Sequence, residues 1–320
     1  MKPKVLVTRK LPGDGIERLR EVADVEVHTG KEELTKEQLI QAVADKDAVI
    51  SLLVNEIDAE VMDAAPHLKV ISNYAVGFNN IDVNAAQERG IIVTNTPDVL
   101  TESTADLTWA LLLAVARRIP ESDSYTREGK FVGWAPELLL GRTVYGKTLG
   151  IIGMGRIGEA VARRAKGFGM NIVYYNRRPL STEIETGLGA IYASLDEVIS
   201  KADFLSLHTP LTRETRYLID ENELNAMKKT AYLINTSRGP LVNEKALVNA
   251  LKANAIAGAG LDVFENEPTI EEELLSFQNV VLAPHIGSAT IETRVEMADL
   301  AINNTISILK GENALTPVYS

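Results

Sequence analysis

Short apolar runs alternate with amphipathic segments along nearly the whole chain, and this alternation constrains the fold more than any other feature. Five runs rich in β-branched residues occur in the first hundred residues: 4–8, 25–29, 48–54, 69–75 and 91–97. Four segments with apolar residues at helical spacing separate them: 15–23, 35–44, 58–66 and 83–90. Strands and helices that alternate in this way predict a parallel, doubly wound α/β sheet.

A second array of the same kind follows residue 147. Its apolar runs lie at 147–153, 171–176, 202–210, 230–239, 255–264 and 279–287. We expect a sheet of six or more strands here, and a final helix over 289–310 that ends at Gly311. The sequence therefore predicts two Rossmann-like α/β domains with an active-site cleft between them.

The segment between the two arrays has two parts. Residues 101–119 predict a long helix that is apolar on nearly all faces, which we expect to be buried between domains or against another subunit. Residues 120–146 lack a strong periodicity but contain Phe131, Trp134 and Tyr145. We interpret this stretch as an arm or loop packed by aromatic side chains, because disordered linkers are poorer in such residues.

Charge and composition exclude several kinds of partner. The 320 residues include 33 Lys and Arg against 44 Asp and Glu, a formal net charge of −11. Nucleic acids and anionic membranes are bound by clustered cations, so we expect neither. No apolar run approaches the roughly 20 residues that span a bilayer, and the first residues lack the apolar region of a signal peptide. We expect a cytoplasmic protein.

Metal and thiol chemistry are not expected either. The chain has no Cys, which excludes disulfides, thiolate zinc sites and cysteine nucleophiles. The four histidines, His28, His67, His208 and His285, show no metal-ligand spacing among themselves.

A glycine-rich turn, "GIIGMGRIG" at 150–158, lies between a predicted strand and a predicted helix. Gly153 permits a tight turn, Gly155 lets the backbone approach a pyrophosphate, and Gly158 permits close helix–strand packing. The amide groups and dipole at the helix N-terminus favour an anion. In this context the glycines predict a dinucleotide-binding site rather than a purely structural turn.

The residues after the next strand indicate which dinucleotide binds. An acidic residue usually stands there and repels a 2′-phosphate, whereas this chain has Asn176, Arg177 and Arg178. Guanidinium groups form charge-assisted bonds with phosphate oxygens, so we expect NADP(H) to be preferred and NAD(H) to be possible. The alternative is two solvated arginines beside an NAD site.

Polar residues end four strands of the second array, where parallel sheets bind their ligands. They are His208, Arg238, the acids Glu265 and Glu267, and His285. With no metal cluster and no nucleophile elbow, a bound cofactor must carry the hard chemistry. Reduction of a 2-keto acid needs a proton donor for the developing alkoxide and a cation for the carboxylate. A His paired with a carboxylate and an Arg supply both.

The segments "GMGRIG", "INTSRGPLVNEKAL", "AGAGLDVFENEP" and "LAPHIGSAT", in this order, resemble the D-isomer-specific 2-hydroxyacid dehydrogenase family over essentially the whole chain. "NYAVGFNNIDV" and "LTRETRYLI" are most similar to its glyoxylate and hydroxypyruvate reductase branch. The resemblance implies catalytic roles for Arg238, Glu267 and His285. His285 would protonate the carbonyl oxygen, Glu267 would orient its ring and favour the charged form, and Arg238 would polarise the carbonyl. Glu265 is the rival of Glu267, and His208 is the rival acid.

The resemblance also implies cofactor contacts. These residues are Gly153, Gly155, Arg156, Ile157, Gly158, Asn176, Arg177, Arg178, His208, Thr209, Pro210, Thr236, Ser237, Asp262 and Gly287. Asp262 would lie near the nicotinamide carboxamide, with an ordinary turn aspartate as the alternative.

On the substrate side, the Val76–Gly77 step would turn backbone amides toward the substrate carboxylate, beside Arg238 and His285. Relatives often have Asp where this chain has Asn79, which weakens a charge-based role at that position. Leu53, with its neighbours 52 and 54, would shape the pocket, and Trp134 would close it from this chain or a partner subunit. Core packing is the alternative for each of these side chains.

The family's chain path implies a discontinuous substrate-binding domain, 1–99 plus 288–320, around a dinucleotide-binding domain, 100–287, that forms a homodimer through 101–146. Rival activities are 2-ketogluconate reductase and 3-phosphoglycerate dehydrogenase. Formate dehydrogenases have Gln beside the histidine, so Glu267 argues against them. The non-enzymatic rival is an NAD(P)-sensing binding protein.

Overall fold

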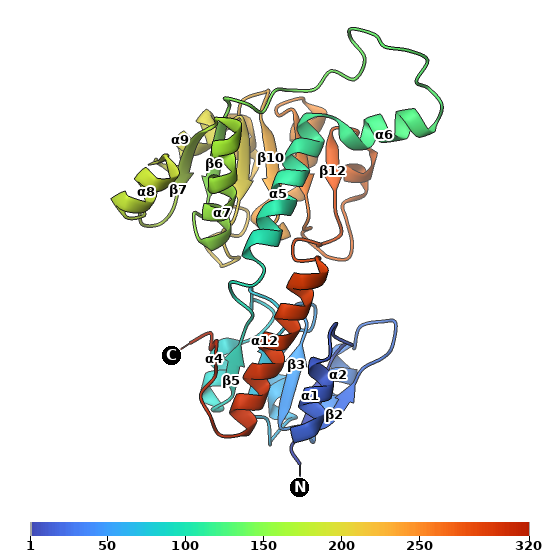
Figure 1. Cartoon of the computed structure of the whole chain (residues 1–320), viewed down its shortest axis with the longest axis vertical. Coiled ribbons are helices and arrows are strands. Elements are labelled where there is room, and N and C mark those ends of the chain that lie inside the picture. The colour runs from blue at the N-terminus through green and yellow to red at the C-terminus, as the bar shows by residue number, and fades with distance from the viewer. Residues whose placement is uncertain (1, 320) are drawn as a thin grey trace. The chain divides into compact units, whose positions relative to one another are not determined.

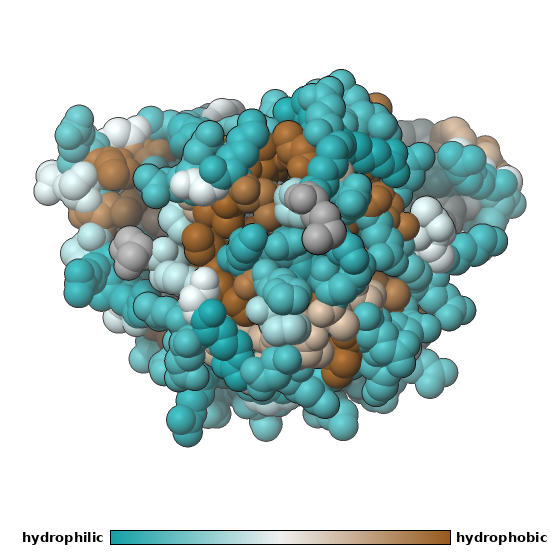
Figure 2. Space-filling model, turned by 90° about the horizontal axis from the view of Figure 1, so that it is seen from below, coloured by the Kyte–Doolittle hydropathy of each residue, from teal (hydrophilic) through white to brown (hydrophobic). Residues whose placement is uncertain are grey.

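The computed structural model describes residues 2–319. The chain divides into two compact units, Met1–Leu100 with Ser288–Ser320 and Thr101–Gly287 (Figure 1). None of the helices in the described range combines the length and the apolar character that crossing a membrane requires. Hydrophilic residues predominate on the face shown in Figure 2, with hydrophobic residues visible in recesses between them.

The first unit is a five-stranded parallel sheet in the order β2-β1-β3-β4-β5. Its strands are β1 (Lys4–Val7), β2 (Asp24–Val27), β3 (Ala48–Ser51), β4 (Val70–Asn73) and β5 (Ile92–Thr94). Its helices are α1 (Gly15–Val22), α2 (Lys36–Val43), α3 (Ala59–Asp63), α4 (Val83–Glu88) and α12 (Ile291–Leu309). Every residue of β3 and β4 is buried, because helices cover both faces of the sheet.

The C-terminal helix α12 returns to this first sheet and packs on α1, β3 and β4. It begins after the N-cap Thr290, whose side chain accepts a hydrogen bond from the amide of Thr293. At its other end the amide of Glu312 donates to the carbonyl of Ser307, and Gly311 takes a φ of 78°. This is the left-handed helix stop for which glycine is favoured, so the predicted end is confirmed.

The second unit is a seven-stranded parallel sheet in the order β12-β11-β10-β9-β6-β7-β8. Its strands are β6 (Thr148–Ile152), β7 (Asn171–Tyr175), β8 (Ala190–Tyr192), β9 (Phe204–Leu207), β10 (Tyr232–Asn235), β11 (Gly258–Leu261) and β12 (Val280–Leu282). Its α-helices are α5 (Thr101–Ala116), α6 (Ile119–Arg127), α7 (Arg156–Ala165), α8 (Thr182–Leu188), α9 (Leu195–Lys201), α10 (Glu221–Ala226) and α11 (Glu244–Lys252). Short 3₁₀ turns occupy Lys166–Phe168, Gly239–Leu241 and Glu272–Ser276. The two sheets confirm the predicted fold class of two Rossmann-like α/β domains.

The strand order reverses at β6, which lies between β7 and β9. In open parallel sheets a crevice forms outside the carboxyl ends of the strands at such a switch point, and ligands bind there. The glycine-rich turn follows β6 and the "HTP" segment follows β9, so both lie at this position.

Helix α5 is buried, but not where the sequence suggested. It packs on β10, β11, β12 and α7 of its own unit. The indole of Trp109 donates to the carbonyl of Val161 at 3.1 Å and stacks on Phe168 with ring centroids 4.6 Å apart. The expectation of burial between domains or against another subunit is therefore wrong for most of this helix. A helix that lies across a sheet and beside another helix needs apolar residues on more than one face.

The segment after α5 also differs from the prediction. Helix α6 occupies Ile119–Arg127 and buries none of its residues. Phe131, Trp134 and Tyr145 are 58%, 85% and 72% exposed, so the predicted aromatic packing does not occur within this chain. The polar sequence of α6 offers no apolar face with which to form a core, and within residues 2–319 the three aromatic side chains that follow it stay largely exposed.

Candidate functional site

The glycine-rich turn after β6 has the geometry of a dinucleotide site. Gly153 has a φ of 96°, and a Cβ there would lie 2.6 Å from the backbone of His208. A Cβ on Gly158 would lie 2.4 Å from the carbonyl oxygen of Gly153, so helix α7 reaches the turn only because residue 158 is a glycine. A Cβ on Gly155 would meet no atom within 4 Å. Open space therefore lies beside the N-terminus of α7, and a pyrophosphate fits it.

Asn176 holds this turn from the end of β7. Its Oδ1 accepts a hydrogen bond from the amide of Met154 at 2.6 Å, and its Nδ2 donates to the carbonyl of the same residue at 3.2 Å. Arg177 and Arg178 follow and are exposed. Hydrogen bonding to Thr212 lowers the pKa of Glu214, and the charge of Arg177 contributes, so Arg177 lies within electrostatic reach of that loop.

His285 and Glu267 form a hydrogen-bonded pair at the carboxyl-end edge of the second sheet. His285 Nδ1 lies 2.7 Å from Glu267 Oε2, and each side chain is 26% exposed. The other carboxylate oxygen accepts the amide of Phe264 at 3.0 Å. Burial would raise the pKa of Glu267, but the hydrogen bond and charge of His285 prevail and lower it. An ionised Glu267 accepts a hydrogen bond from Nδ1–H, which leaves Nε2 as the atom able to pass on a proton.

The backbone of His285 is itself unusual, with a φ of 54°. Non-glycine residues seldom adopt this conformation, and in known proteins such strain often accompanies a functional site. The chain turns here directly after β12, and this turn directs the imidazole toward Glu267.

Arg238 comes to the same edge from β10. The carbonyl oxygen of Arg238 accepts a hydrogen bond from Nδ2 of Asn235 at 2.9 Å. Nη1 of Arg238 donates a hydrogen bond to the carbonyl oxygen of Ser237 at 2.7 Å. Burial lowers the pKa of Arg238 and the charge of Glu267 raises it, so the two groups interact electrostatically. A Cβ on Gly239 would lie 1.8 Å from the carbonyl oxygen of Phe264. Only glycine allows the arginine segment to approach the segment that carries Glu267.

The geometry distinguishes between the two acids, and between the two histidines, that the sequence left open as candidates. The hydroxyl of Tyr217 donates to Glu265, whose other oxygen accepts the amide of Glu244 at 3.4 Å. Glu267 is therefore the acid that contacts His285. Burial lowers the pKa of His208 to about 4, and its Nε2 lies 2.8 Å from the hydroxyl of Ser206. His208 is neutral at pH 7 and is the poorer proton donor.

Asp262 has the structural role of a turn aspartate, which the sequence left open as the alternative to a cofactor contact. Its buried carboxylate accepts the amides of Ile286 at 2.7 Å and Gly287 at 2.8 Å, and its carbonyl accepts the amide of His285 at 2.8 Å. Burial raises its pKa to about 6, against the two amides and the charge of His285. Asp262 thus fixes the turn that carries His285, and the cofactor contact expected of it stays a prediction.

The remaining predicted cofactor contacts are of two kinds, residues held by hydrogen bonds or burial and residues at the surface. Thr236 is buried with its hydroxyl 2.8 Å from that of Thr108, and Ser237 donates to the carbonyl of Thr209 at 2.6 Å. The Thr209 hydroxyl is buried, and no described residue hydrogen-bonds to it, which suits a ligand at the glycine turn. Residues at the surface or partly exposed are Arg156, Ile157 and Pro210.

The predicted substrate residues of the first unit lie in loops after neighbouring strands. Leu53 is partly exposed after β3, and Val76 and Gly77 are partly exposed after β4. Asn80 links the two loops, since its Nδ2 donates to the carbonyls of Leu52 at 3.2 Å and Asn55 at 3.0 Å. Sequence reasoning missed this link, because an asparagine in a loop carries no distinguishing pattern.

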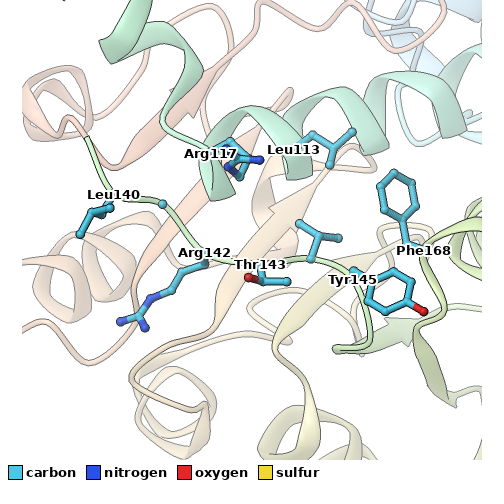
Figure 3. Close-up of a pocket in the computed structure, with 9 residues that line it drawn as sticks. Leu113, Arg117, Leu140, Arg142, Thr143, Tyr145 and Phe168 are labelled. Atoms are coloured by element: carbon cyan, nitrogen blue, oxygen red, sulfur yellow. The ribbon is translucent and has the colours of Figure 1, made fainter. Parts of the chain in front are cut away.

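A cavity of about 510 Å³ lies elsewhere in the second unit (Figure 3). Leu113 of α5 and Arg117, which directly follows α5, line it together with Arg142, Tyr145 and Phe168. Residues 140–145 precede the amino end of β6, so the cavity lies away from the carboxyl-end edge that carries His285. It has no acid or histidine in its lining. Within residues 2–319 no group of three or more His, Asp or Glu is placed to hold a metal ion.

Comparison with known proteins agrees with this geometry. Residues 109–287 match the family described as D-isomer specific 2-hydroxyacid dehydrogenase, NAD binding domain. A glyoxylate reductase from Thermococcus kodakarensis is 54% identical over 316 residues, which cover 98% of this chain and 95% of that protein. The crystal structure of a glyoxylate reductase from Paecilomyes thermophila has a TM-score of 0.89 at 37% identity and covers 99% of this chain and 98% of that chain.

A further solved structure is that of an NADPH-dependent glyoxylate/hydroxypyruvate reductase from Sinorhizobium meliloti in complex with NADP and malonate. Its TM-score is 0.90 at 39% identity, covering 100% of this chain and 97% of that chain. The fold, the glycine turn and nearly full-length similarity lead to one conclusion. The chain belongs to the D-isomer-specific 2-hydroxyacid dehydrogenase family.

Proposed function

We propose that the protein is an NADPH-dependent reductase of small 2-keto acids, glyoxylate and hydroxypyruvate, which yields the D-2-hydroxy acid where a stereocentre forms. The observation that carries this proposal is the 2.7 Å contact between His285 and Glu267, within electrostatic reach of Arg238. The relatives named glyoxylate reductase support the choice of substrate.

His285 supplies the proton that the carbonyl oxygen of the keto acid takes up during reduction. Glu267 accepts a hydrogen bond from Nδ1–H and fixes the ring, so Nε2 delivers its proton to the carbonyl oxygen as negative charge develops there. The carboxylate of Glu267 also stabilises the imidazolium before transfer. A bound nicotinamide would supply the hydride to the carbonyl carbon.

Arg238 and the first unit hold the substrate. The Arg238 guanidinium polarises the keto oxygen and binds the carboxylate through charge-assisted hydrogen bonds. Backbone amides of the loop that contains Val76 and Gly77 bind the carboxylate as well, and Leu53 limits the size of the keto acid's substituent.

We assign the cofactor preference to Arg177 and Arg178. Both are exposed beside the glycine turn, where an acid would otherwise contact the ribose. Their cations bind the 2′-phosphate of NADPH, while NADH remains a poorer substrate. The relative solved with NADP supports this assignment.

We also propose a homodimer that covers the segment 119–145. Large apolar side chains are exposed along it: Ile119 at 55%, Phe131 at 58%, Val132 at 95%, Trp134 at 85%, Leu140 at 63% and Tyr145 at 72%. Exposed apolar patches of this kind usually mark interfaces. Light scattering should give twice the chain mass of 34.9 kDa, and a monomer would contradict the proposal.

One spectrophotometric screen tests the activity. Oxidation of NADPH and of NADH is followed with glyoxylate, hydroxypyruvate, pyruvate, 2-ketogluconate and phosphohydroxypyruvate. We expect the highest kcat/KM for NADPH with glyoxylate or hydroxypyruvate. A higher kcat/KM for 2-ketogluconate or phosphohydroxypyruvate would mean that this compound, and not glyoxylate or hydroxypyruvate, is the preferred substrate. Cofactor binding without any turnover would instead indicate a nucleotide-sensing protein.

A further inference from the structure

Two asparagine side chains hold the carbonyl groups of the loop that follows β4. Nδ2 of Asn73 donates to the carbonyl oxygen of Gly77 at 2.8 Å, and Nδ2 of Asn95 donates to that of Val76 at 2.8 Å. Asn73 is the last residue of β4, and Asn95 directly follows β5, the neighbouring strand. Consecutive carbonyls of one loop are therefore fixed from two strands of the sheet.

Fixing a carbonyl also fixes the amide of the next residue. In a trans peptide the C=O and the following N–H point in opposite directions within one plane. The amide of Gly77 thus points away from Asn95, and the amide of Phe78 points away from Asn73. Among residues 2–319 neither amide donates to a protein acceptor, so two adjacent donors are available to a ligand.

The orientation of Asn73 is determined by its own partners. The residue is completely buried, and its Oδ1 accepts from the hydroxyl of Ser51 at 3.2 Å and from Nδ2 of Asn80 at 3.3 Å. Because the oxygen is occupied, the NH₂ group must face the carbonyl of Gly77. A buried amide with all its partners in place is costly to rotate, so it holds the loop firmly.

We propose that Asn73 and Asn95 are positioning residues, which aim the amides of Gly77 and Phe78 at the carboxylate of the substrate. This inference rests on the proposed reduction of a 2-keto acid. The asparagines themselves do not touch the substrate. They act through the two peptide planes, so that the amides lose little freedom when the anion binds.

The test measures reduction of glyoxylate and of methyl glyoxylate, which has the same aldehyde but no carboxylate. Loss of a prearranged pair of donors to an anion should raise KM for glyoxylate about tenfold in Asn95→Ala and in Asn73→Ala. We expect kcat to stay within about twofold, because the carboxylate is bound equally in the ground and transition states. KM for methyl glyoxylate should change less than about twofold.

Thr35→Ala is the matched control. Thr35 caps α2 in the same unit through its hydrogen bond with Gln38 and does not contact the loop. The substitution Thr35→Ala should lower the Tm of the protein without changing the KM for glyoxylate. If Asn73→Ala fails to fold, Asn95→Ala, at a partly exposed position, carries the test alone.

An unchanged KM for glyoxylate in the folded variants, or equal losses for both compounds, would overturn the inference. A wild-type protein that reduces no glyoxylate would instead refute the proposed function.

Discussion

Replacing Glu267 with glutamine removes one charge from the proposed catalytic pair and keeps the shape of the side chain. The two carboxylate oxygens have separate partners, the imidazole of His285 at 2.7 Å and the amide of Phe264 at 3.0 Å. Glutamine has a single oxygen and can accept from only one of them. Its NH₂ group then faces a second N–H donor, so the variant loses both the charge and one of the two hydrogen bonds.

The size of the effect follows from this geometry. Hydrogen bonds to charged groups contribute about 1.5–3 kcal/mol, and the partial exposure of both side chains favours the lower half of that range. Since 1.4 kcal/mol corresponds to about a tenfold change in rate, kcat should fall by a factor of about 10 to 50.

Steady-state NADPH oxidation measures kcat, and fluorescence titration measures the Kd of NADPH, which should stay within about twofold. Glu265→Gln is the control, because Glu265 bonds to Tyr217 and Glu244 and makes no hydrogen bond to His285. The reasoning fails if Glu267→Gln keeps kcat within about twofold, or if Glu265→Gln loses as much activity.

Other variants separate the proton donor, the cofactor contact and the stability of the second unit. His285→Ala should lower kcat by about 10²–10⁴-fold with little change in the Kd of NADPH; near-normal turnover would reject His285 as the donor. Arg177→Ala with Arg178→Ala should lower kcat/KM for NADPH about tenfold or more and leave that for NADH nearly unchanged, and an equal loss with both cofactors would contradict the 2′-phosphate contact. The folded-state pKa of His208, about 4, lies below its ordinary value of 6.5. The unfolded chain therefore binds the extra proton, and stability is lost as pH falls from 6.5 toward 4, by up to about 3 kcal/mol. Urea unfolding should show that the free energy of unfolding depends less on pH in His208→Gln than in the wild type. The same pH dependence in both proteins would refute the lowered pKa of His208.

The sequence predicted the architecture because several central strands of both sheets are buried along their whole length. Parallel strands between two helical layers are largely apolar, as in β3 and β4, and such runs are visible without knowledge of their neighbours. Strand β8 was harder to identify, because it is a three-residue edge strand with Ile191 and Tyr192 exposed. Helix α6 was missed for a related reason, since it buries none of its residues.

The candidate site could be predicted only as far as the residue types and their strand ends. His285 and Glu267 are 18 positions apart, and their contact depends on a left-handed turn at His285 and on the close approach at Gly239. The role of Asp262 depends on the backbone amides of Ile286 and Gly287, 24 and 25 positions further along the chain, and a backbone donor cannot be recognised from the residue type. The exposed aromatics of 131–145 look like core residues in a sequence, because hydrophobicity alone does not say which chain covers them.

The link that Asn80 makes between the loops after β3 and β4 has a consequence for how this enzyme could change. A longer or differently folded loop around Leu53 would displace Asn80, and through its hydrogen bond with Asn73 would tilt the peptide that joins Gly77 to Phe78. Insertions in either loop should therefore be poorly tolerated in directed evolution. New substrate ranges are more accessible through side-chain replacements at Leu53 and Val54, which leave the asparagine network intact.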